Sequence, residues 1–177
     1  MPGIKDFKNK VVVITGAGSG IGRATALAFA KEGAVLVIAD KDEQRLKTVQ
    51  GEIQSLGAKA LIKPTDVSDK EQVRQLSEFV IRELGRVDIL HNNAGVSVGG
   101  RIEDTPLEDW EWLLGINLWG GNLRGTLFPS LHDKTARRAY REHIQRARAC
   151  SHTRHGNIFY GKICCYGAWR GIKARGP

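Results

Sequence analysis

The first segment suited to binding a ligand is a glycine-rich turn, Thr15-Gly16-Ala17-Gly18-Ser19-Gly20-Ile21-Gly22. It follows a β-branched run at 11–15 and precedes a helical pattern of apolar residues. Glycines let the backbone approach a phosphate group closely, and the N-terminus of a following helix favours an anion. The spacing therefore predicts a site for the pyrophosphate of a dinucleotide; the alternative is a plain connection between a strand and a helix. The cofactor-binding residues predicted here are Gly16, Ser19, Gly20, Ile21 and Gly22.

A carboxylate stands at the end of the second apolar run. Asp40 follows the residues 35–39 and lies 18 residues after Gly22. In a dinucleotide site, a carboxylate at this position accepts hydrogen bonds from the ribose hydroxyls and repels a 2′-phosphate. The predicted cofactor is therefore NAD rather than NADP, although the adjacent Lys41 carries the opposite charge. The alternative is that Asp40 caps the helix that begins near Asp42.

Two more polar segments follow apolar runs. Thr65-Asp66-Val67 comes after the residues 60–62, and Asn92-Asn93-Ala94-Gly95 comes after 87–90. Open α/β folds bind their ligands at the C-terminal edge of the sheet, where such segments would meet. We expect Asp66 and Val67 near the adenine, and Asn93, Ala94 and Gly95 along the cofactor cleft. The alternative for each segment is an ordinary turn.

Strand and helix patterns alternate along the first 120 residues. Apolar runs predict strands at 11–15, 35–39, 60–62 and 87–90, and helical spacing predicts helices at 24–32, 42–56, 69–84 and 108–119. This alternation favours an α/β fold with a Rossmann-type doubly wound parallel sheet. Right-handed crossovers then place the strands in the order 3-2-1-4.

The motifs occur together and in sequence order. The glycine-rich turn, Asp40, Asp66-Val67, Asn92 to Gly95 and Asn117 all lie within residues 1–120. With them the chain resembles the short-chain dehydrogenase/reductase family, in the branch with TGxxxGIG near the N-terminus. The resemblance implies a Rossmann fold, a nicotinamide cofactor and a small-molecule alcohol or ketone substrate. It implies homo-oligomers for the intact family, but the different sequence after residue 120 argues against them for this chain.

The resemblance also implies a catalytic set of Asn, Ser, Tyr and Lys. In the family the Tyr is the general acid/base, and the Lys lowers the pKa of that phenol from its ordinary value of about 10. Asn117 matches the Asn, and Lys162 is the candidate for the Lys. The alternative for Asn117 is a helix residue whose side chain backbone groups satisfy, and the alternative for Lys162 and Tyr160 is that they are ordinary surface residues. The Tyr-x-x-x-Lys pattern is absent, because Ile158 stands four residues before Lys162 and Tyr160 only two. We therefore predict a NAD-dependent oxidoreductase that is catalytically impaired; the alternative is a NAD-binding remnant without turnover.

Composition changes after residue 120. Residues 1–120 hold 15 Lys and Arg against 17 Asp and Glu, whereas residues 121–177 hold 12 against 2. From 133 to 154 the sequence is rich in Arg and has little apolar periodicity, so it predicts no strand, and a helix is the alternative there. We therefore divide the chain into a NAD-binding Rossmann half, 1–120, and an aberrant basic continuation of the same domain, 121–177. The second half of the sheet is expected to be incomplete.

Codon degeneracy offers an explanation of the basic segment. Read one nucleotide later, codons for 128–145 can encode a family-like strand that ends in Ser-Ser, and codons for 158–168 can encode Tyr-Ser-Thr-Glu-Lys-Tyr-Ala-Val-Met-Gly-Leu. The second stretch contains the missing pattern, with its Lys at position 162. We hypothesise that the segment is a frameshifted reading of a dehydrogenase gene. Nucleic-acid binding through the arginines is an alternative, but no nucleic-acid-binding fold accompanies them, so nucleic acid is not an expected partner.

Two further classes of protein are not expected. No apolar run reaches the length of a membrane span, and the first ten residues lack the apolar core of a signal peptide. We therefore predict a cytoplasmic protein without a membrane partner. Cys150, Cys164 and Cys165 lack metal-ligand spacing, so no metal site is predicted.

Overall fold

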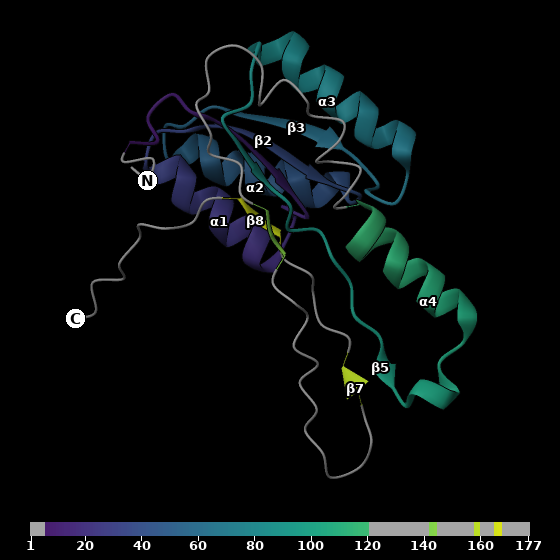
Figure 1. Cartoon of the computed structure of the whole chain (residues 1–177). Coiled ribbons are helices and arrows are strands. Elements are labelled where there is room, and N and C mark those ends of the chain that lie inside the picture. The colour runs from purple at the N-terminus through teal and green to yellow at the C-terminus, as the bar shows by residue number, and fades with distance from the viewer. Residues whose placement is uncertain (1–5, 121–141, 145–157, 160–164, 168–177) are drawn as a thin grey trace, which may run out of the picture.

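Four parallel strands form the central sheet in the computed structural model, which describes residues 6–120, 142–144, 158–159 and 165–167. They are β1 (Val11–Thr15), β2 (Val35–Asp40), β3 (Ala60–Pro64) and β4 (Ile89–His91). Between them lie α1 (Gly20–Lys31), α2 (Glu43–Ser55) and α3 (Lys70–Leu84). The strand order is β3-β2-β1-β4, so the predicted Rossmann-type sheet and its order are confirmed. Figure 1 shows β2 and β3 of this sheet together with the helices that flank it.

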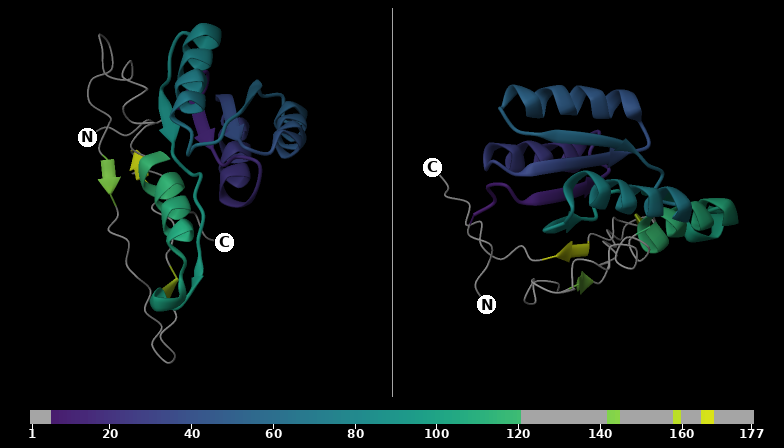
Figure 2. Two further views of the ribbon diagram at one scale, coloured as in Figure 1. Left: turned by 90° about the vertical axis from the view of Figure 1, so that its right-hand side faces the viewer. Right: turned by 90° about the horizontal axis from the view of Figure 1, so that it is seen from above.

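Alternating side chains along β1 explain why helices cover both faces of the sheet. Val12 and Ile14 pack in one apolar cluster with side chains of α1 and α2, whereas Val11 and Val13 pack in another with side chains of α3. Figure 2 shows α1 and α2 on one side of the sheet and α3 on the other. A strand buried on both faces needs apolar residues at every position, which is why 11–15 is an unbroken β-branched run.

Aspartates fix the starts of α2 and α3. Asp42 Oδ1 accepts a hydrogen bond from the Arg45 backbone N–H at 3.0 Å. Asp69 Oδ1 accepts from the backbone N–H groups of Glu71 at 2.8 Å and Gln72 at 3.3 Å. Each cap satisfies N–H groups that a helix end leaves unpaired, and a cap of this kind stabilises a helix by about 1 kcal/mol.

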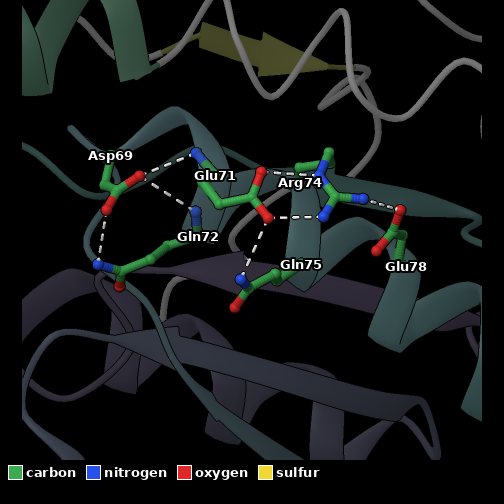
Figure 3. Close-up of polar contacts among 6 residues, drawn as sticks. All are labelled: Asp69, Glu71, Gln72, Arg74, Gln75 and Glu78. Carbon is green, nitrogen blue, oxygen red and sulfur yellow. Dashed lines mark hydrogen bonds and ion pairs between the residues drawn. The ribbon is translucent and has the colours of Figure 1, made fainter.

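The first turns of α3 carry a polar network (Figure 3). The Arg74 guanidinium donates to both carboxylate oxygens of Glu71 and reaches Glu78 one turn further on. The hydrogen bonds from Arg74 lower the pKa of the Glu71 carboxyl to about 2. Gln72 Oε1 accepts a hydrogen bond from the Asp66 backbone N–H at 2.8 Å. The start of α3 is thereby tied to the turn that follows β3.

Three strands differ in extent from the prediction. β2 extends one residue beyond 39, to Asp40. β4 begins at Ile89 rather than at 87, because the Asp88 side-chain Oδ2 accepts from the Val11 backbone N–H at 2.8 Å in place of a strand carbonyl. β3 extends beyond 62 to Pro64, which pairs with Asp40. Because β3 lies at the edge of the sheet, a proline without an N–H group is tolerated there.

The helix predicted at 108–119 consists of two helices. α4 (Leu107–Leu114) continues into a π-helical turn, η2 (Gly115–Trp119), and a short 3-10 turn, η1 (Ile102–Asp104), precedes α4. A π-helical turn is wider than an α-helical one and is frequent at functional sites. Among the helices that the structure describes, none combines the length and apolar content needed to cross a membrane.

Four short strands form two small antiparallel pairs that the sequence did not predict. β5 (Gly99–Gly100) pairs with β7 (Ile158–Phe159), and β6 (Glu142–Ile144) pairs with β8 (Cys165–Gly167). The prediction of no strand within 133–154 is therefore wrong. Pairing with a segment distant in the chain supplies backbone hydrogen bonds without local apolar alternation, so the sequence pattern gives no signal for it.

Candidate functional site

A cleft of about 300 Å³ lies at the C-terminal edge of the sheet, a volume at the lower end of the range for small-molecule sites. The connections that follow all four strands line it, together with α4 and η2. The lining residues are Gly16, Ser19, Gly20, Ile21, Asp40, Lys41, Arg45, Thr65, Asp66, Val67, Asn93, Ala94, Gly95, Val96, Trp112 and Ile116. The structure thus brings together every predicted cofactor-binding residue except Gly22.

Two glycines let the glycine-rich turn pack against the chain around it. Gly16 has a φ of +63°, and a Cβ atom there would lie 2.7 Å from the Ala94 Cα. A Cβ atom at Gly22 would overlap the Gly16 carbonyl oxygen and lie 2.5 Å from Asn93 Nδ2. Gly22 therefore lies behind the turn rather than in the cleft wall. Its missing side chain permits the close approach of α1 to β1 that places the turn.

The N-terminus of α1 opens onto the cleft. The side chain of Ser19, its N-cap residue, makes no capping hydrogen bond, and the first turn holds no acidic residue. In contrast, Asp42 and Asp69 cap α2 and α3. The positive end of the α1 dipole is therefore not offset by a carboxylate of its own first turn, which suits it to an anion.

Asp40 lies beside this turn at the end of β2. Its Oδ2 accepts a hydrogen bond from the Gly18 backbone N–H at 3.0 Å, and its Oδ1 accepts from the Asp42 backbone N–H at 3.1 Å. The alternative that Asp40 caps the next helix is wrong, because Asp42 fills that position. Asp40 instead joins the glycine-rich turn to the start of the β2–α2 connection, with its carboxylate in the cleft wall.

Side-chain hydrogen bonds hold the other two predicted segments. Asn93 Nδ2 donates to the backbone oxygens of Thr15 and Gly16, both at 3.0 Å, which ties the segment after β4 to the glycine-rich turn. Asp66 Oδ1 accepts from the Ser68 backbone N–H at 2.9 Å and from the Ser68 hydroxyl at 2.6 Å. Side-chain hydrogen bonds therefore hold these two walls of the cleft in place.

Asn117 lies in the π-helical turn η2, and only 4% of it is exposed. Its Oδ1 accepts from the Val96 backbone N–H at 2.9 Å, and its Nδ2 donates to the Val96 backbone oxygen at 2.8 Å. The sequence left open whether backbone groups satisfy this side chain. They do, but they belong to the segment after β4 rather than to the helix of Asn117 itself.

Replacing Asn117 is expected to loosen this wall of the cleft. Asn117→Ala removes both partners of Val96 and leaves a partly buried N–H and C=O unpaired, at a cost of about 1–3 kcal/mol for each. We expect a lower denaturation midpoint in urea than for the unchanged chain. Thr105→Ala is the control, because the Thr105 hydroxyl makes one exposed bond to the Arg101 backbone oxygen. Equal midpoints for Asn117→Ala and the unchanged chain would contradict this role.

Sequence reasoning missed four residues of the cleft wall: Arg45, Val96, Trp112 and Ile116. Ile116 precedes Asn117, and Arg45 lies in the first turn of the helix after Asp40, so adjacency was the available signal. No sequence pattern indicated that Trp112 would line the cleft, because its position depends on how α4 packs beside the sheet. Lys162 and Tyr160 lie outside the described residues.

A family model described as short chain dehydrogenase matches residues 10–133. By sequence, the chain is 49% identical over 114 residues to the protein named "Probable oxidoreductase EphD" of Mycobacterium tuberculosis. That match covers 64% of this chain and 19% of the relative.

Two solved structures also resemble the chain. A short chain dehydrogenase/reductase from Burkholderia phymatum in complex with NAD has 39% identity and a TM-score of 0.70, over 72% of this chain and 46% of that one. A metagenomic short-chain oxidoreductase in complex with NADP has 32% identity and a TM-score of 0.68, over 71% of this chain and 57% of that one. The chain therefore spans less than two thirds of the length of each of these three proteins.

Proposed function

The chain belongs to the short chain dehydrogenase family, and from this premise we propose that it is an oxidoreductase whose residues 1–120 bind NAD. The proposed substrate is a small alcohol or ketone. The cytoplasmic location and the division at residue 120 stay predictions, as does the frameshift hypothesis for 121–177.

One observation carries this proposal: segments from all four strand ends converge on one cleft that begins at the glycine-rich turn. The turn suits a pyrophosphate, because glycine at positions 16 and 22 lets the turn pack closely against Ala94 and against the start of α1, and α1 points an uncapped N-terminus at the cleft. We assign Asp40 to the adenosine ribose, Asp66 and Val67 to the adenine, and Asn93 to Gly95 to the remaining length of the cofactor; all of them line the cleft. When bound, NAD supplies a hydride acceptor for the oxidation of a hydroxyl group.

The proposed catalytic residues are Asn117 and Lys162. In the described residues, Asn117 positions the segment after β4 through Val96, and we propose that it also supports a proton relay. Lys162 would supply positive charge to a phenol. Because Ile158 occupies the position four residues before it, this chain lacks the phenol that the charge would serve.

Cofactor preference tests the proposal. We expect NADH to bind more tightly than NADPH, because a phosphate dianion beside the Asp40 carboxylate costs more than about 1 kcal/mol, or about fivefold in Kd. Fluorescence titration of the full chain with both reduced cofactors measures the ratio. Asp40→Asn removes the charge but keeps an acceptor oxygen, and we expect it to bring the two Kd values closer together.

The control for this titration is Asp66→Asn, which removes a carboxylate from another wall of the same cleft. It should leave the ratio of the two Kd values nearer to that of the unchanged chain than Asp40→Asn does. Equal or tighter binding of NADPH by the unchanged chain would overturn the assignment of Asp40. Failure to bind either cofactor would overturn the proposed function.

A further inference from the structure

Four charged side chains gather where β2 leads into α2. Asp40, Lys41 and Arg45 line the cleft, and Asp42 lies between them in sequence but not in the cleft wall. Asp42 contacts Arg45 twice: its Oδ1 accepts the backbone N–H at 3.0 Å, and its Oδ2 lies 3.1 Å from the guanidinium Nε. One carboxylate therefore caps α2 and holds the side chain of Arg45.

Arg45 lies close to the group proposed to bind the ribose. A Cβ atom built at Gly18 would be 3.0 Å from Arg45 Cβ and 3.0 Å from Asp40 Oδ2, so these two groups flank the same point of the glycine-rich turn. The side chain of Arg45 is 63% exposed and that of Asp42 is 39% exposed. An exposed ion pair of this kind is weak, so the direction of the guanidinium depends on which anions compete for it.

We propose that Asp42 is a positioning residue for cofactor choice, which rests on the proposed function of NAD binding. By holding Arg45, Asp42 keeps the guanidinium from pairing with a 2′-phosphate at the adenosine end of the cleft. A free guanidinium binds phosphate through two parallel N–H donors and would favour NADP. Asp42 thus supports the preference that Asp40 sets by repulsion.

Local charge leads to the same conclusion. Asp40 and Asp42 together balance Lys41 and Arg45, and Glu43 pairs with Lys47, so this end of the cleft carries no excess positive charge. Neutralising Asp42 leaves two cations against one carboxylate. Neutralising Asp42 has two effects, because it releases Arg45 and it removes a negative charge. A double-mutant cycle separates these two effects.

The test is titration of the full chain with NADH and NADPH at low salt. Asp42→Asn keeps an oxygen that can cap α2, because Asn caps helices about as well as Asp, but the NH2 group that replaces Oδ2 is a donor and cannot accept from the guanidinium. We expect Asp42→Asn to shift the ratio of the two Kd values about fivefold toward NADPH. Raising the salt concentration should shrink this shift, because exposed charges are screened.

The matched control is Asp69→Asn. Asp69 caps α3 with one oxygen as Asp42 caps α2, but its Oδ2 accepts from the neutral amide of Gln72 at 3.0 Å (Figure 3). Asp69 is not among the residues that line the cleft. We expect the same chemical change at Asp69 to leave the ratio of the two Kd values unaltered, so that a shift specific to Asp42 reports on the cleft and not on a weakened cap.

The second half of the cycle places Asp42→Asn in an Arg45→Gln background. If Asp42 acts by holding Arg45, the added substitution there should change the ratio by less than about twofold. A full shift in that background would overturn the proposal, since charge alone would then suffice. An unchanged ratio in the single variant, with both cofactors still bound, would overturn it while leaving the proposed function intact. Loss of all binding in the unchanged chain would overturn both.

Discussion

Turnover of secondary alcohols with NAD is expected to be at least about a thousandfold slower for this chain than for a version with a repaired catalytic segment. The family resemblance implies that the general acid/base is a phenol whose pKa a neighbouring positive charge lowers, and Ile158 stands where that phenol would precede Lys162. The measurement is NADH production against a panel of secondary alcohols at saturating NAD.

The repaired protein is the control for this measurement. It is obtained by reading the gene one nucleotide later across the basic segment, which restores Tyr-x-x-x-Lys with its Lys at position 162. We expect it to oxidise a member of the panel with a pH dependence that reports the phenol. Rates typical of the family in the unchanged chain, lost in Tyr160→Phe, would identify Tyr160 as the working phenol and contradict the prediction. A gene sequence without a family-like second frame would remove the basis for the repair.

Gly22→Ala is expected to destabilise the fold by about 3 kcal/mol and to weaken NAD binding by at least about tenfold. The new Cβ atom would overlap the Gly16 carbonyl oxygen, and this is a backbone atom that cannot rotate away. Either α1 moves from β1 or the glycine-rich turn shifts, and both displace the proposed pyrophosphate site. Thermal melts and NADH titration measure the two effects.

Gly51→Ala makes the same change in a helix without the clash. Gly51 is an exposed residue of α2, and a Cβ atom there meets nothing within 4 Å. Because glycine in a helix costs about 0.5–1 kcal/mol relative to alanine, this variant should melt at a higher temperature than the unchanged chain. If Gly22→Ala has the same melting temperature as Gly51→Ala and the same affinity for NADH, the close approach of α1 to β1 is not what places the turn.

The sheet was predictable because its strands are buried on both faces. Residues 11–14 and 35–39 are apolar without interruption and can pack against helices on both faces of the sheet, and the intervening helices then limit the strand order to few choices. The cofactor-binding residues were predictable for the same reason, since strand ends must meet at one edge. The strand boundaries were less predictable, because the start of β4 depends on the Asp88 side chain, which competes with a backbone acceptor.

Contacts between segments distant in sequence could not be predicted. No local pattern indicates that Asn117 pairs with the backbone of Val96, or that Asn93 bonds to Thr15 and Gly16 across β1 and β4. The π-helical turn was missed because its residues have the same apolar spacing as an α-helix. Such features depend on how the helices and strands pack against one another, and local sequence patterns do not indicate this packing.

The strand order has a consequence for folding during synthesis on the ribosome. β1 and its neighbour β2 are synthesised early, but β4, which pairs with the other edge of β1, ends about 50 residues after β2. At roughly 5–20 residues per second, that edge stays bare for about 3–10 s of synthesis. During this time the growing chain exposes unpaired N–H and C=O groups on a strand whose side chains are apolar on both faces. We expect nascent chains halted before His91 to bind chaperones, and chains halted well beyond it to escape them.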